Sequence, residues 1–121
     1  MGVGFSNKSD NMIDDTISKL ETQLREAGNL SPARQAQLSQ LLGTLKAEVM
    51  ELSKTNREGA QSITRFAEAS ALEATRTERN AKLQELSLEG FKSSVTGLEA
   101  SHPKLVQAVN SISQMLSNLG I

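Results

Sequence analysis

The sequence has no cysteine, tryptophan or tyrosine, and only three phenylalanines and one histidine among its 121 residues. Without cysteine there is no disulfide, no thiolate metal site and no thiol nucleophile. The scarcity of aromatic rings leaves no platform on which bases or sugars could stack. One histidine and no tyrosine leave few groups for general acid–base catalysis. We therefore expect a protein that is not an enzyme and that carries no cofactor.

Neither sign of charge is in excess, because the chain has 13 Lys and Arg residues and 14 Asp and Glu residues. A nucleic-acid-binding protein normally has a clear basic excess. No stretch approaches the roughly 20 apolar residues that a membrane-spanning helix needs. The first residues also lack the basic and apolar regions of a secretory signal. We expect a cytoplasmic protein that binds no nucleic acid and does not span a membrane.

What the sequence does contain is helical periodicity. We expect residues 1–10 to form a flexible N-terminal arm. Apolar residues spaced four and three apart then predict a helix over residues 11–27. These residues are Ile13, Ile17, Leu20, Leu24 and Ala27. Ser31 can cap a second helix and Pro32 suits its first position. Its apolar stripe is Leu38, Leu41, Leu42, Leu45, Val49 and Leu52. The short connection between the two predicts an antiparallel hairpin within a single helical domain over residues 11–121.

The middle of the chain is poor in large apolar residues. Between residues 53 and 82 these are only Ile63, Phe66 and Leu72, but good helix formers dominate the rest. We expect the second helix to continue through this stretch, with a break between Asn56 and Gly59 as the alternative. The apolar pattern resumes at Leu83 and stops before Pro103. A last helix then carries Leu105, Val109, Ile112, Leu116 and Leu119.

These elements predict an all-α fold, in which a long central helix has a short helix folded back on it at each end. Such a monomer has a poor core, because the three middle residues have no partner within the chain. We therefore expect a homo-oligomer, and specifically a dimer, that completes a helical bundle or coiled coil. The predicted interface comprises Ile63, Phe66, Leu72, Leu105, Val109, Ile112, Leu116 and Leu119.

The C-terminal third resembles a known family. The run Leu98-Glu99-Ala100-Ser101-His102-Pro103-Lys104-Leu105 precedes a helix that ends Leu116-Ser117-Asn118-Leu119-Gly120-Ile121. An apolar residue and Glu, then His-Pro, then a Leu and a terminal Gly-Ile, are similar to the signature of the bacterial domain-of-unknown-function family 4404. Residues 30–45 are similar to the N-terminal half of that family. The resemblance implies a small helical bacterial protein and no particular activity.

His102 is the only side chain whose ordinary pKa lies near neutrality, and Glu99 precedes it by one helical turn. The pair is a weak candidate for a metal site, since one histidine without cysteine holds a metal poorly. The alternative is that His102 and Pro103 only turn the chain. Two functions remain open: a structural or protein-interaction module, which we favour, and a small-ligand or metal-binding bundle with its site near His102, Glu99 and Phe91.

Overall fold

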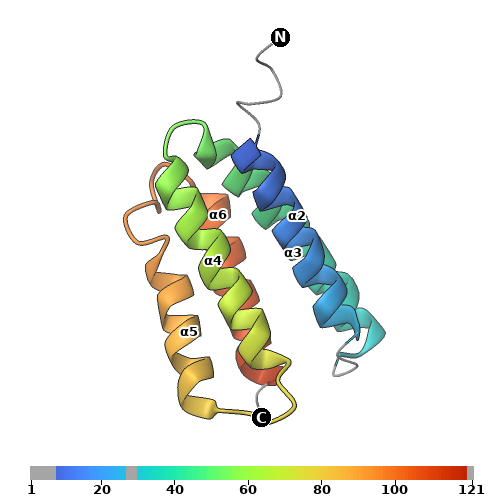
Figure 1. Cartoon of the computed structure of the whole chain (residues 1–121). Coiled ribbons are helices and arrows are strands. Elements are labelled where there is room, and N and C mark those ends of the chain that lie inside the picture. The colour runs from blue at the N-terminus through green and yellow to red at the C-terminus, as the bar shows by residue number, and fades with distance from the viewer. Residues whose placement is uncertain (1–7, 27–29, 120–121) are drawn as a thin grey trace.

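The computed structural model describes residues 8–26 and 30–119, and within them it contains helices and no strand. The five helices are α2 (Lys8–Glu26), α3 (Pro32–Ser53), α4 (Arg57–Ala74), α5 (Ala81–Ser93) and α6 (Pro103–Leu119). They lie alongside one another as a bundle, with α2 and α3 on one side, α5 on the opposite side, and α4 and α6 between them (Figure 1). The all-α prediction is confirmed. None of the described helices is both long enough and apolar enough to cross a bilayer.

The hairpin of α2 and α3 forms as the periodicity predicts. The Ser31 hydroxyl accepts a hydrogen bond from the Arg34 N–H at 3.3 Å, and Pro32 is the first residue of α3. The apolar stripes of both helices enter one continuous core. Helix α2 begins at Lys8, so residues 8–10 belong to it and not to the predicted arm. Residues 1–7 and the expected helix end at Ala27 lie outside the described residues.

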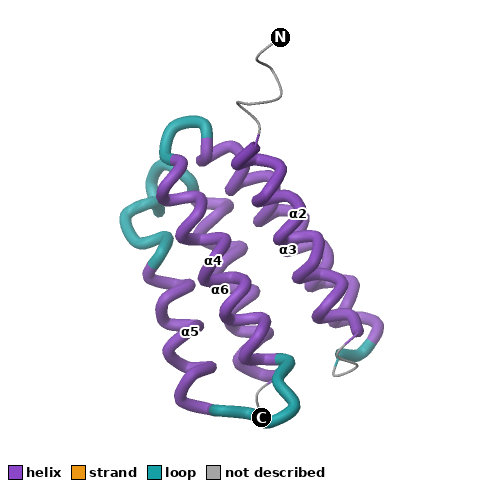
Figure 2. The backbone as a smooth tube through the Cα atoms, in the orientation of Figure 1, coloured by secondary structure: helices purple, strands orange, loops and turns teal. Residues whose placement is uncertain are grey.

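The prediction of a long central helix is wrong. The chain reverses after α3 and again after α4, so that α4 packs against both α3 and α5 (Figure 2). The first reversal falls where a break was the alternative: the Leu52 carbonyl accepts from the N–H groups of Thr55 and Asn56 at 3.0 and 2.8 Å. The Asn56 side chain then caps α4 by accepting from the Gly59 N–H at 2.9 Å. Asparagine is among the best N-caps, which explains why a new helix starts here.

Gly59 is inside α4 and does not end a helix. A β-carbon at this position would lie 2.5 Å from the amide nitrogen of the Asn56 side chain. The glycine therefore leaves room for the capping side chain. The chain breaks between α3 and α4 because the Asn56 side chain caps α4, and Gly59 leaves room for that side chain.

The second reversal lies between α4 and α5 and was not predicted. Where α4 ends, the Thr75 hydroxyl donates to the Ala71 carbonyl at 2.9 Å, and the Thr75 N–H donates to the same carbonyl at 3.1 Å. The Asn80 side chain accepts from the Leu83 N–H at 3.0 Å, which begins α5. The Asn80 side chain thus satisfies a backbone donor that the first turn of α5 leaves free. The connecting segment contains no proline or glycine, so the usual markers of a turn are missing.

Helix α6 packs against α3, α4 and α5, and this corrects the predicted interface. Ile63 is fully buried in the core of its own chain. It belongs to the same apolar cluster as the α6 residues that we expected to face a second copy. Those residues of α6 are also buried within the chain: Leu105, Val109, Ile112, Leu116 and Leu119. The premise that one chain cannot cover them fails because the reversals bring α3 and α4 alongside α6. Of the predicted interface, only Phe66 and Leu72 are exposed.

Candidate functional site

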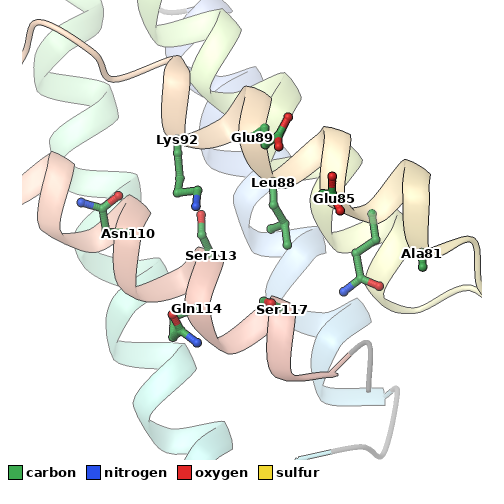
Figure 3. A pocket seen from close by; sticks show the side chains of 10 residues that line it. Ala81, Glu85, Leu88, Glu89, Lys92, Asn110, Ser113, Gln114 and Ser117 are labelled. Carbon is green, nitrogen blue, oxygen red and sulfur yellow. The ribbon is translucent and has the colours of Figure 1, made fainter.

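A groove of about 570 Å³ runs between α5 and α6. Most of the side chains that line it are polar (Figure 3). Helix α5 contributes Ala81, Gln84, Glu85, Leu88, Glu89 and Lys92, and α6 contributes Asn110, Ser113, Gln114 and Ser117. The volume is in the range of about 300–1,000 Å³ that is typical of small-molecule sites.

Gln84 fixes one end of the groove. Its side chain is buried, and its amide nitrogen donates to the Leu116 carbonyl at 2.8 Å. The guanidinium of Arg79, in the connecting segment before α5, donates to the Leu119 carbonyl. Carbonyls in the last turn of a helix have no intrahelical partner. These two contacts therefore tie the C-terminal end of α6 to the start of α5.

Ser113 lies in the wall of the groove, and the environment of its hydroxyl is unusual. The residue is only 4% exposed, and within the described chain its Oγ has no hydrogen-bond partner. A buried polar group without a partner costs about 1–3 kcal/mol. Ser113 lines the groove, so the groove is the side from which a partner for this hydroxyl could come.

Lys92 supplies positive charge beside that hydroxyl. In Figure 3 its side chain extends from α5 towards Ser113. Among the described residues, Glu85 has an ion pair with Lys82 at 3.7 Å, whereas Lys92 has no carboxylate partner. Glu89 is exposed on the same helix. The groove thus presents an unpaired ammonium group, a buried hydroxyl and neutral amides.

A second surface is apolar and lies on the other side of α5. We define the α4–α5 apolar face as Phe66, Leu83 and Leu86, which are all exposed large apolar residues. Leu83, Leu86 and Gly90 are three and four residues apart, so they share one face of α5. Leu72 is six residues after Phe66 and therefore lies about 120° around α4 from it, outside this face. The other exposed large apolar residues among those described are Leu72 and Met12.

Gly90 explains why this face is continuous across two helices. A β-carbon at Gly90 would lie 2.3 Å from the Phe66 ring, closer than real atoms approach. The glycine therefore allows the ring to lie directly against the backbone of α5. The close contact joins Phe66 of α4 to the apolar residues of α5 in one surface.

His102 and Glu99 lie in the connection between α5 and α6. The backbone N–H of His102 donates to the Leu98 carbonyl at 2.7 Å, and its carbonyl accepts from the Val106 N–H. The Glu99 carboxylate accepts from the Gly97 N–H at 3.0 Å. Gly97 has a φ of +91°, a conformation that favours glycine. The structure therefore shows the backbone of His102 and the carboxylate of Glu99 taking part in a turn.

The structure does not gather a ligand site around His102. Phe91, the third residue of that candidate site, is fully buried in the core and cannot line an open pocket. Across residues 8–26 and 30–119, no three His, Cys, Asp or Glu residues lie close enough to hold a metal ion together. The groove between α5 and α6 was not predicted from the sequence. The neutral polar surface of α6 was its only signal in the sequence.

The fold defines a small all-helical bundle with a polar groove between α5 and α6 and an exposed apolar face where α4 meets α5. The family described as a domain of unknown function (DUF4404) matches residues 38–121, so the chain belongs to that family. The predicted resemblance is thereby confirmed. The match includes most of α3 and all of α4, α5 and α6, but not α2. Searches of curated proteins and of solved structures gave no match.

Proposed function

We propose that this protein is a non-enzymatic interaction module that associates with a second copy of itself through the α4–α5 apolar face. The observation that carries the proposal is the exposure of Phe66, Leu83 and Leu86 where α4 meets α5, with Gly90 against the Phe66 ring. Scattered single apolar residues on a surface are ordinary, whereas a contiguous group marks an interaction surface. This interface replaces the one that we expected from the sequence.

The size of the apolar face predicts a dimer of modest affinity. Fully burying a Leu or Phe side chain is worth roughly 1.5–3 kcal/mol, and these side chains are already about half covered. Six of them in two copies would then contribute on the order of 6 kcal/mol. Association costs an estimated 4–15 kcal/mol. The two quantities are comparable, so we expect the dimer to depend on protein concentration.

The charges of α5 suit a two-fold arrangement. The helix carries Lys82 and Lys92 together with Glu85 and Glu89, so it is neutral overall. If two copies of α5 pair in antiparallel fashion about Leu86, Lys82 of one copy lies beside Glu89 of the other. A two-fold interface brings the same patch of each copy together. Among the described helices, α5 packs only on α4 and α6, and its outer side faces none of them.

Light scattering after gel filtration tests the proposal. The wild-type chain should approach twice 13.0 kDa as its concentration rises. Leu86→Asp should shift it to the mass of one chain, because the aspartate would have to be buried without a partner. Met12→Asp is the matched control, since Met12 is 67% exposed and lies outside the apolar face.

A wild-type chain that stays monomeric at every concentration would refute self-association. A Leu86→Asp variant that dimerises as well as Met12→Asp would place the interface on another surface. Circular dichroism of both variants would verify that the five helices are retained.

A further inference from the structure

We propose that the groove between α5 and α6 binds a small monocarboxylate whose remaining atoms carry neutral hydrogen-bonding groups, such as hydroxyls or amides. The inference does not depend on self-association, because the groove and the α4–α5 apolar face lie on different sides of α5. It also differs from the ligand site that the sequence suggested near His102. The proposal of a monocarboxylate ligand rests on the residues that line the groove.

The ligand's carboxylate would lie at Lys92 and Ser113. The Lys92 side chain extends towards Ser113 from the opposite wall (Figure 3). The Ser113 hydroxyl is buried and has no partner in the described chain, so it can donate without breaking another contact. An ammonium group and a hydroxyl are donors that bind carboxylates through charge-assisted hydrogen bonds.

The charge around the groove limits the ligand to a single negative charge. Lys92 is its one cation, and two carboxylates, Glu85 and Glu89, also line it. A phosphate or a dicarboxylate would bring two negative charges towards those glutamates. Like charges at close range repel, and the repulsion is stronger where water is excluded. A monoanion matches the one ammonium group of the groove and brings the least negative charge towards the two glutamates.

The rest of the lining indicates what else the ligand carries. From α6 the groove is lined by Asn110, Gln114 and Ser117, which are neutral donors and acceptors. Leu88 is the only large apolar side chain that lines it. Such a wall matches hydroxyl or amide groups better than a fatty chain. The ligand class is therefore a polar monocarboxylate.

Titration followed by amide resonances in NMR spectra tests the proposal. The probes are gluconate, which carries hydroxyls, and N-acetylglycine, which carries an amide. Saturable shifts are expected at Lys92, Ser113 and Ser117. Gluconamide and N-acetylglycinamide, which lack the carboxylate, should bind about tenfold more weakly or not at all. Inorganic phosphate should bind more weakly than either acid.

Variants separate binding from folding. Lys92→Gln should weaken binding by about tenfold, whereas Lys104→Gln, exposed and outside the groove, should leave it unchanged. Ser113→Ala should weaken binding without lowering stability, because it removes a hydroxyl that has no partner in the described chain. The proposal is overturned if neither acid gives saturable shifts in the groove, if the amides bind equally well, or if Lys92→Gln has no effect.

Discussion

At the scale of single residues, three side chains decide where helices begin. Ser31, Asn56 and Asn80 each accept a hydrogen bond from an N–H group three residues later. Each contact satisfies a backbone donor that the first turn of a helix leaves free. The direction of the chain therefore depends on a few polar atoms, and the apolar core determines which helices then pack together.

Removing one cap should destabilise the bundle measurably. Ser31→Ala should lower the free energy of unfolding by about 0.5–2 kcal/mol, because the Arg34 N–H loses its acceptor. The shift of the urea midpoint measures the loss. Ser62→Ala, an exposed position within α4, should not lower stability, since alanine is the better helix former. Equal midpoints for Ser31→Ala and the wild type would show that the cap is not needed.

A second prediction concerns the buried amide of Gln84. Gln84→Met keeps the length of the side chain but removes the donor to the Leu116 carbonyl. The free energy of unfolding should fall by about 1–3 kcal/mol, because a buried acceptor is left without a partner. Gln114→Met, on the exposed wall of the same groove, should change it little. If both variants unfold at the same urea concentration, Gln84 does not hold α6 to α5.

At the scale of helices, the sequence predicts some elements well and others poorly. The stripes of Ile17 and Leu24 in α2, and of Val109 and Ile112 in α6, give the correct helices because their spacing is regular. The reversal after Ala74 was missed because Thr75 and Asn80 act through side-chain hydrogen bonds. Without proline or glycine, such a turn resembles a polar stretch of helix.

The candidate site also could not be predicted fully from the sequence. The groove could not be predicted because it needs α5 and α6 to lie side by side with a known register. The exposure of Phe66 and Leu72 was predicted, but the burial of Ile63 was not. Ile63 and Phe66 are only three residues apart on α4, and the packing of neighbouring helices decides which one is covered. The sequence alone does not specify that packing.

The contact between α4 and α5 gives a prediction about this packing. Gly90→Ala should destabilise the bundle, although alanine favours helices by about 1 kcal/mol, because its β-carbon would collide with the Phe66 ring. Phe66→Ala removes the ring, so Gly90→Ala should be neutral or stabilising in that background. Urea unfolding of the two single variants and the double variant measures the coupling. Additive effects would contradict the close approach of the two helices.

At the scale of the whole molecule, α2 adds a helix outside the part of the chain that matches the family. It packs on α3 and α4, where Ile17 and Leu24 are buried in the common core. Gln23 also donates to the Thr75 hydroxyl at 2.9 Å, which ties α2 to the end of α4. We infer that α2 folds together with the other four helices as one unit.

A substitution in α2 should therefore destabilise the whole chain. Ile17→Ala should cost about 2–5 kcal/mol, the range for a buried large-to-small change, in a single unfolding transition. Lys19→Ala, exposed on the same helix, serves as the control. A separate early transition that involves α2 alone, seen by hydrogen exchange, would show that this helix is an independent appendage.

The position of the proposed two-fold interface is tested most directly by cross-linking, because the chain has no cysteine of its own. Leu86→Cys and Met12→Cys each introduce a single thiol on an exposed position. A disulfide requires β-carbons about 3.5–4.5 Å apart. Under mild oxidation, Leu86→Cys should form a covalent dimer rapidly, and Met12→Cys only slowly through random collisions. Equal, slow rates for the two variants would contradict an interface in which α5 faces its own copy.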